Sequence, residues 1–512
     1  MSQFSIKFTR LNKRISNACI LVLTLHSAVA FSKPEPEPEP KAEAEAEAEV
    51  ASPTKSVSPE EPHYLRAAIG EALAVGAGTA WYWIDRERQV ADWDALSWSQ
   101  RLTLDVIRYD NNPFNINFAG HAFNGAGYHA IARANGLGLY ASAGLGLLTS
   151  ITWEYALEFR EKVSINDLIF TTGVGVPLGE FFHVLGTYLS LDPGASRAFA
   201  AKWTAGLPMA LTGALDGRPV ASLATKPEMW HEMALSYSLG LSSTTRAEEG
   251  DTHNLHTVRY DAKFVRIPRY REEGTWSRSF RSAEFTEASF SLSEASGGDA
   301  AAMQVDTILL GHYRQSIVPG ELSSATMLGV AMAYQYQREQ IGDWDYRVGV
   351  YHFPGLAADL YLENKGLFLN AKTRLHYDFA GVNSLPNAEW NAAHPDEQGK
   401  TILRKMGYSY DYGPSARFSL EGGYKKVTLG ASIWAAYYKS DEGLDRIQED
   451  LTVDQKGSEE IWDTRLWLEA SELPWRSFVR LEMNDRRRTS KLAELEIAGS
   501  LRRYTMALGI QF

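Results

Sequence analysis

The feature that most constrains this chain is a two-residue period in its C-terminal half, from about Glu228 to the end. In the stretch 367–379, alternate positions form an apolar set and a polar set. The apolar set is Leu367, Leu369, Leu375, Tyr377 and Phe379, and the polar set is Asn370, Lys372, Arg374, His376 and Asp378. A charged face along a whole strand is costly inside a soluble β-sandwich. It suits the wall of a membrane barrel, with lipid outside and a hydrated lumen inside.

The same alternation recurs in segments whose lengths suit a tilted, membrane-spanning strand of about 9–11 residues. In 328–337 it predicts that Tyr334 and Tyr336 face lipid, whereas Gln335 and Gln337 face the lumen. The other predicted strands are 233–242, 255–267, 284–293, 302–314, 357–365, 405–412, 416–424, 427–438, 464–472, 477–485, 491–499 and 504–512. Because bacterial barrels have even strand numbers, we expect an antiparallel transmembrane β-barrel of about 12 strands, within a range of about 10–14. The predicted fold class is therefore mainly β.

The N-terminal segment is typical of an export signal, and the C-terminal residue is typical of an outer-membrane assembly signal. Basic residues precede an apolar run from Ala18 to Val29, and the small residues that end at Ala30 suit a signal peptidase. We therefore expect residues 1–30 to be a signal peptide cleaved near Ala30; an uncleaved N-terminal anchor is the alternative. The cysteine count is one, Cys19, so the mature chain has neither a disulfide nor a cysteine metal site. The final Phe512 resembles the signal that the outer-membrane assembly machinery recognises, which predicts location in the outer membrane.

Residues 31–62 form an acidic linker that contains KPEPEPEPKAEAEAEAE, a composition that predicts an extended spacer rather than a core. The formal net charge of −12 and the absence of a basic cluster exclude nucleic acid as an expected partner. The expected partners are outer-membrane lipid and the barrel assembly machinery.

Residues 63–219 have a helical, glycine-rich pattern and precede the barrel at 228–512. Gly70, Ala74 and Gly78 form a smooth stripe on which another backbone can pack closely. The run 136–153 has no charge, but its glycines and hydroxyl side chains make it only mildly apolar. We expect a buried helix there, packed against or inside the barrel.

The helical domain also holds ionisable residues in apolar surroundings, where charges are costly unless paired. They are His121, His129, Arg133, Glu154, Glu158, Asp167, Glu180 and His183. One interpretation is a buried network in which Arg133 and the histidines neutralise the carboxylates. The other is a catalytic site, with His121, Glu154, Glu158, Asp167 and Glu180 as the candidates and a buried carboxylate working with a histidine as acid or base.

Known cofactor and hydrolase motifs find little support. Glu180 with His183, and Glu228 with His231, match the Glu-x-x-His pair of di-iron bundles, but such pairs also arise by chance. No Gly-x-Ser-x-Gly elbow occurs, and the glycines at 136 and 138 lack the rest of a dinucleotide site. We therefore predict no cofactor and no metal.

An ordered series of short motifs in the helical domain resembles the family known as domain of unknown function 3943, over about residues 110–185. These motifs are Asn112-Pro113-Phe114, Gly120-His121, Gly127-Tyr128, Ala132-Arg133, Asn135-Gly136, Trp153-Glu154-Tyr155, Glu158, Ser164, Asn166-Asp167-Leu168, Thr172-Gly173, Gly175 and Gly179-Glu180. The resemblance implies an exported, Gram-negative outer-membrane protein. It supplies no catalytic role.

Three functions are compatible with this sequence. The favoured hypothesis is a non-enzymatic envelope role, in which the helical domain occludes a plugged or gated barrel. The first alternative is a membrane-embedded enzyme that acts on a lipid or lipopolysaccharide through the Glu/His/Asp cluster. The second is an adhesion or assembly module, for which 383–400 and 440–462 are the loops of suitable length. Whether the protein is an enzyme stays open, as do its substrate, its oligomeric state and the conductance of its lumen.

Overall fold

The computed structural model describes residues 61–82, 98–103, 107–110, 112–159, 162–190, 205–217, 229–246, 249–342, 344–395, 402–441 and 455–512. The predicted signal peptide, its cleavage site near Ala30 and nearly all of the predicted linker lie outside these residues.

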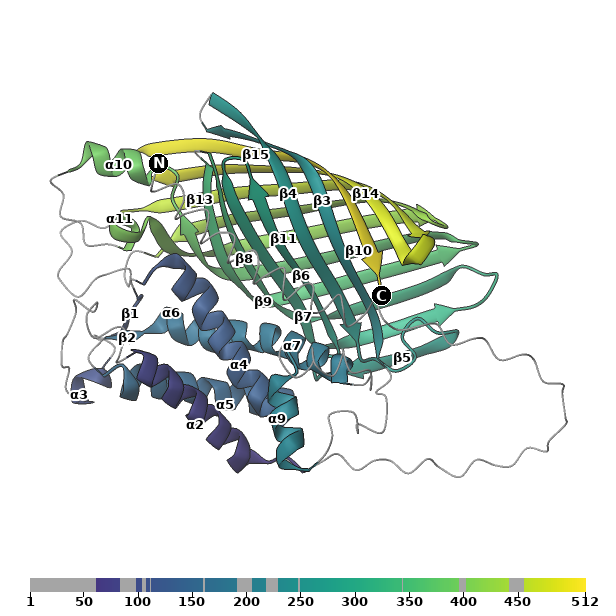
Figure 1. Ribbon diagram of the computed structural model, residues 1–512, viewed down its shortest axis with the longest axis horizontal. Helices are drawn as coiled ribbons and strands as arrows, with labels where there is room; N and C mark the ends of the chain where they lie inside the picture. The colour runs from purple at the N-terminus through teal and green to yellow at the C-terminus, as the bar shows by residue number, and fades with distance from the viewer. Residues whose placement is uncertain are drawn as a thin grey trace.

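The C-terminal part is an antiparallel barrel with twelve strand positions (Figure 1). Its strands are β3 (Trp230–Arg246), β4 (Glu249–Val265), β5 (Gly274–Phe280), β6 (Phe285–Ala295), β7 (Gly298–Ile317), β8 (Ser323–Ile341), β9 (Trp344–Asn364), β10 (Leu367–Asn383), β11 (Tyr408–Tyr424), β12 (Val427–Ser440), β13 (Gly457–Leu473), β14 (Ser477–Leu492) and β15 (Leu495–Gln511). Pairing of β7 with β8 closes the barrel. β5 and β6 share one position, because they pair with opposite ends of β7. The predicted barrel is confirmed.

Several predicted strand boundaries are wrong. Residues 408–412 and the segment 416–424 belong to one strand, β11, which continues through Pro414, whereas residues 405 and 406 are helical. The segment 491–499 contains the turn at Ala493 between β14 and β15. β5 and the first half of β9 were not predicted. In these places the sheet tolerates a proline or extends past the alternating segment, which sequence period alone does not reveal.

Contacts between strands that are not neighbours identify the lumen. Lys372 on β10 contacts Glu287 on β6 at 2.7 Å, and Arg486 on β14 contacts Glu339 on β8 at 2.7 Å. These strands are separated in the sheet, so their side chains meet only across the interior. Leu375 and Tyr377 have the opposite orientation and are 49% and 51% exposed. The predicted inward and outward faces of β10 are therefore confirmed.

The N-terminal part consists of helices with a small parallel pair of strands. Its elements are α2 (Tyr64–Trp81), α3 (Trp98–Arg101), β1 (Ile107–Arg108), η3 (Ile116–Gly120), α4 (His121–Ala134), α5 (Leu139–Thr152), η4 (Trp153–Leu157), β2 (Val163–Ser164), α6 (Ile165–Leu168), η5 (Ile169–Val174), α7 (Gly175–Ser190) and α9 (Leu207–Leu215). We call these elements the helical unit. η3, η4 and η5 are π-helical turns. Two further helices, α10 (Asn387–Ala393) and α11 (Ile402–Met406), lie between β10 and β11.

Glycine allows the helices to approach one another closely. A Cβ atom at Gly125 of α4 would lie 1.7 Å from the backbone oxygen of Thr171 in η5, so no larger residue fits. The predicted small-residue stripe of α2 packs as expected, since Gly70 faces Ile131 and Gly78 faces Trp153. These contacts join α2, α4 and η5 into one packed body.

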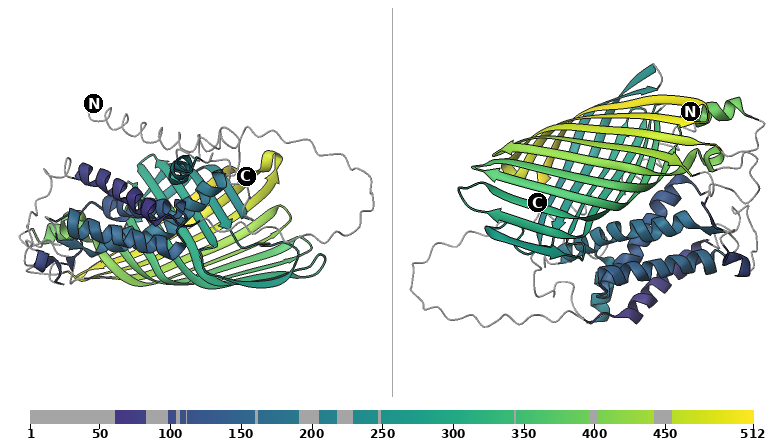
Figure 2. Two further views of the ribbon diagram at one scale, coloured as in Figure 1. Left: turned by 90° about the horizontal axis from the view of Figure 1, so that it is seen from below. Right: turned by 180° about the vertical axis from the view of Figure 1, so that it is seen from behind.

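The helical unit lies on the outer wall of the barrel and not in its lumen (Figure 2). Phe118 of η3 packs over Gly349 and Gly381, where an added Cβ would overlap its ring. The hydroxyl of Tyr334 donates to the backbone oxygen of Phe118. Gln335, the next residue, points inward and accepts a hydrogen bond from Arg417. The expectation that the helices occlude the lumen is therefore wrong, because the faces they cover are the outward ones.

Candidate functional site

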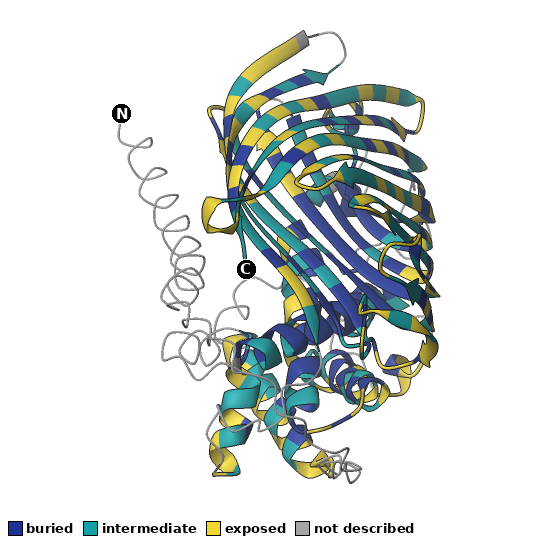
Figure 3. Cartoon of the chain, turned by 90° about the vertical axis from the view of Figure 1, so that its right-hand side faces the viewer, coloured by how far each residue is buried: buried dark blue, intermediate teal, exposed yellow. Residues whose placement is uncertain are grey.

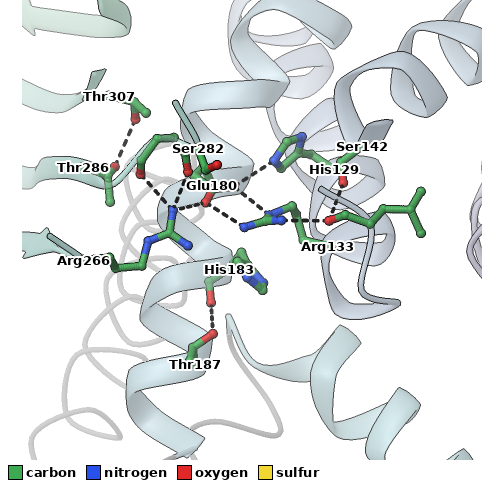
Figure 4. A network of polar contacts seen from close by, with 12 residues as sticks. His129, Arg133, Ser142, Glu180, His183, Thr187, Arg266, Ser282, Thr286 and Thr307 are labelled. Carbon is green, nitrogen blue, oxygen red and sulfur yellow. Dashed lines mark hydrogen bonds and ion pairs between the residues drawn. The ribbon is translucent and has the colours of Figure 1, made fainter. Parts of the chain in front are cut away.

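The predicted ionisable residues of the helical unit form two separate clusters. The first surrounds Glu180 on α7, which has no exposed surface (Figure 4). His129 Nε2 of α4 lies 3.1 Å from its carboxylate, and Arg133 donates to both carboxylate oxygens at 3.0 and 3.2 Å. Arg266, which follows β4, donates at 2.6 Å. Hydrogen bonds from two arginines favour the ionised carboxylate.

Arg266 connects this network to the barrel. Its guanidinium also donates to the backbone oxygens of Ser282 and Ala283, at the break between β5 and β6. His183 lies beside the network on α7 (Figure 4). The Glu180 network therefore joins two helices to the barrel wall, and its saturated carboxylate suits a structural connection better than proton transfer.

The second cluster is centred on His121, at the start of α4. His121 Nε2 lies 3.3 Å from Asp167 Oδ1, and its Nδ1 lies 3.2 Å from the hydroxyl of Thr171. Glu154, Glu158 and Asp167 bring one carboxylate oxygen each to within 4.8 Å of one another. The structure thus brings His121, Glu154, Glu158 and Asp167 together, whereas His129, Arg133 and Glu180 lie in the other cluster.

Buried donors surround the acidic residues of the His121 cluster. The backbone N–H of Ser164 donates to Glu154 at 3.0 Å. Arg101 is buried and donates to the backbone oxygens of Glu154 and Glu158 at 3.2 and 3.0 Å. Three converging carboxylates are also ligands that hard cations prefer. The arrangement therefore has the chemistry for acid–base work or for a cation, beside a structural role.

A second Glu-x-x-His pair does not form on a helix, because His231 lies in strand β3. Its partner Glu228 lies outside the described residues. The Glu180 carboxylate is occupied by arginine and histidine donors. The described residues thus do not assemble the four-helix ligand set of a di-iron site.

The lumen contains a cavity of about 570 Å³. It reaches the turn between β11 and β12, where Lys425 lines it. Its walls carry charges of both signs, among them Arg259, Asp261, Lys372, Glu421, Arg480 and Glu482. We call this cavity the vestibule.

Side chains of the barrel wall fill the lumen toward the other end. Arg486 joins opposite walls, with Nη1 2.7 Å from Glu339 and Nε 2.9 Å from Asp463. Arg503 adds a contact with Glu339 at 3.1 Å. The guanidinium of Arg486 also lies 4.6 Å from the ring centre of Tyr346. Beside it is a buried apolar layer that consists of Trp344, Tyr346, Val348, Val350, Ala380, Val382, Trp434, Ala436, Tyr438, Ile461 and Leu501.

A further group that could hold a metal lies in the lumen wall and was not predicted. His352 on β9 contacts Asp378 on β10 at 2.8 Å, and His376 lies beside them, with the two imidazole rings 4.9 Å apart. Tyr438 donates to the other oxygen of Asp378 at 2.8 Å. The positive charges of Arg374 and Arg417 act on His376. Because like charges repel, these arginines disfavour a metal cation at this position.

The sequence also did not indicate the roles of Arg266 and Arg101. Both lie far along the chain from the residues they contact, and no local pattern reports such a contact. Phe512 extends the last barrel pairing, since its N–H donates to Met233 O at 3.0 Å. Its side chain is partly buried against the core that includes the helical unit.

One helical stretch, Ile165–Leu189, is long and apolar enough by length and composition to cross a membrane. It includes α6, η5 and nearly all of α7, and an 18-residue window within it has a mean hydropathy of 1.4 and is 67% buried within the protein. Such burial is that of a core helix, which fits its contacts with α4 and the barrel.

The positions of these clusters can be compared with known proteins. Residues 106–209 match the domain of unknown function 3943. The match includes η3 to α7 and nearly all of the His121 cluster and the Glu180 network, and confirms the resemblance predicted from the sequence. A search of curated proteins finds no match.

Solved outer-membrane barrels resemble the chain at low identity. An outer-membrane channel from Pseudomonas putida F1 has 8% identity and a TM-score of 0.27, covering 56% of this chain and 97% of its own. The translocator domain of the autotransporter NalP from Neisseria meningitidis has 10% identity and a TM-score of 0.19, covering 63% and 99%. OpdQ from Pseudomonas aeruginosa has 8% identity and a TM-score of 0.15, covering 55% and 99%. The likeness concerns barrel architecture alone.

Proposed function

We propose that this protein is a gated outer-membrane conduit for small charged solutes, closed at rest by the side chains of its own wall. The observation that supports this proposal is Arg486, which bridges Glu339 and Asp463 from opposite sides of the lumen. Its guanidinium also lies 4.6 Å from the ring centre of Tyr346, a residue of the apolar layer. A side-chain bridge can open without movement of a domain, and the vestibule offers charges of both signs to an entering solute.

Single-channel recording in planar bilayers tests the gate. Arg486→Gln removes the bridge, and we expect it to raise the open probability above that of the wild type. Arg487→Gln is the matched control, because Arg487 is adjacent on β14 but 68% exposed outside the lumen. We expect it to behave as wild type.

A second variant keeps the test decisive if Arg486→Gln fails to fold. Glu339→Gln removes the shared partner of Arg486 and Arg503. Folding is checked by the heat-dependent mobility of the barrel on gels. Folded variants that all remain silent over the full range of voltage would show that the lumen is not a conduit.

The His121 cluster supports a second function, a membrane-embedded enzyme that acts on lipid. Its histidine lies between the Thr171 hydroxyl and the Asp167 carboxylate, which is the order of groups in nucleophilic catalysis. The test is release of fatty acid from phospholipid vesicles by the purified protein. The proposal requires activity that is lost in His121→Ala and Thr171→Val and retained in Arg487→Gln; inactive wild-type protein refutes it.

A further inference from the structure

We propose that the helical unit lies at the depth of the bilayer and that lipid acyl chains cover its outer face. The inference rests on the barrel and is independent of the gate. Lipid would contact the barrel directly on one part of its circumference and the helices on the other.

Strand β8 shows at which depth the helices lie. Its outward side chains are apolar from Leu328 to Tyr336, and they are bounded by Thr326 and Arg338. This nine-residue span matches the 9–11 residues that a tilted strand needs to cross a bilayer. Leu328 is 61% exposed, whereas the helical unit buries Tyr336 at the other end of the span. The helices therefore cover part of the span that lipid would otherwise contact.

The covered surface continues the bare lipid-facing surface without a polar boundary. On β10 the outward Tyr377 is 51% exposed, and Phe379, two residues further along, packs against the helical unit. Most other outward residues beneath the helices are also apolar or aromatic, namely Phe264, Phe290, Met303, Val305, Tyr408 and Tyr410. The outward Thr286 and Thr307 are polar, but their hydroxyls are buried and bond to each other. A barrel wall whose outer face is exposed to water would carry polar side chains in these positions.

The face of the helical unit that points away from the barrel is also apolar. Along α2, Leu65, Ile69 and Leu73 follow one another at four-residue spacing and are 75%, 51% and 70% exposed. Leu207, Leu211 and Leu215 repeat this spacing on α9, and α5 exposes Leu147, Leu148 and Ile151. A helix that faces water normally presents polar residues there. Figure 3 shows exposed positions on the outer side of the helices and buried ones where they meet the strands.

Charged residues of these three helices turn away from that face. α5 and α9 contain no charged residue, and α2 contains only Arg66 and Glu71. Arg66 pairs with Asp216, and Glu71 is buried and accepts a hydrogen bond from Thr149. Because a helix in lipid must satisfy its polar groups internally, this inward pairing is what a bilayer location requires.

Fluorescence quenching tests the location. Single cysteines at Leu73, Leu148 and Leu211 are labelled with an environment-sensitive dye, in mature chain that lacks the signal-peptide Cys19. The protein is reconstituted in phosphatidylcholine vesicles with either acyl-chain spin labels or aqueous iodide as quencher. Leu508→Cys, on the bare outer wall of β15, is the lipid control; Lys425→Cys, in an exposed turn, is the water control.

We expect the three helix labels to match Leu508→Cys, with strong quenching by the spin-labelled chains and weak quenching by iodide. Labels that instead match Lys425→Cys would place the helical unit in water and overturn the proposal. Labels that neither quencher reaches, together with disulfide cross-links between chains when the same variants are oxidised without dye, would assign the face to a second copy and would also overturn it.

Discussion

Replacing Glu180 with glutamine should lower the temperature at which the helical unit detaches from the barrel wall, relative to the wild type. Glu180 receives three side-chain donors in a site with no exposed surface, two of them arginines. The amide keeps one acceptor but removes the negative charge, so Arg133 and Arg266 lose the only carboxylate that each contacts in the described part of the chain. Breaking a buried pair costs about 3–5 kcal/mol.

The lower end of that range applies because both arginines keep other acceptors. Arg133 retains Leu137 O at 2.7 Å, and Arg266 retains Ser282 O and Ala283 O at 3.0 and 2.8 Å. A loss of about 3 kcal/mol lowers the melting midpoint of a unit of this size by roughly 6–12 °C. The measurement is the helical circular dichroism band in detergent, beside limited proteolysis that releases the helical unit while the barrel stays heat-modifiable.

Glu71→Gln is the matched control, since Glu71 is also buried but has no arginine partner among the described residues. Burial raises the pKa of Glu71 to about 7, against the opposing hydrogen bond from Thr149. When the folded-state pKa of a carboxyl group is raised, the protein loses stability as the pH rises above the unfolded-state pKa of about 4.3. The loss is complete once the pH exceeds the folded-state pKa. We therefore expect Glu71→Gln to gain stability relative to wild type as the pH rises through this window. A Glu180→Gln variant that melts with the wild type would refute the proposed connection.

Two further predictions concern the barrel. Deleting Phe512 should reduce the yield of folded, heat-modifiable barrel, because we expect the assembly machinery to recognise this aromatic residue and because its N–H extends the pairing of β15 with β3 at Met233. A normal yield would contradict the expected partner. Lys372→Cys should react with a membrane-impermeant aqueous reagent, because Lys372 lines the vestibule. Tyr377→Cys should not react, because Tyr377 is exposed on the outer wall, where lipid is expected. Reversed labelling would contradict the assigned faces.

Strand faces could be predicted from the sequence because each strand reports its own alternation. Lys372 and Leu375 therefore separate correctly without knowledge of any neighbour. The sequence pattern does not show what covers a strand. Leu328 and Tyr334 have the same place in the alternation, yet Leu328 is exposed whereas Tyr334 is buried and bonded to Phe118. His121 and Asp167 lie in the same helical segment of the sequence, so their proximity could be anticipated. The contact of Arg266 with Glu180 could not, because Arg266 lies in the barrel segment.

The position of Phe118 bears on whether the helical unit can act as a movable plug. Its ring fits over Gly349 and Gly381 on β9 and β10, where any Cβ would overlap it. Barrel glycines thus form the recess for a helix residue, and Tyr334 fixes the backbone above it with a hydrogen bond. A plug that leaves its barrel needs a surface it can slide along, but this ring must be lifted out of its recess. The charged bridge from Glu180 to Arg266 must break in the same movement. We infer that the helical unit is a fixed part of the wall, so any gate must lie among the lumen side chains.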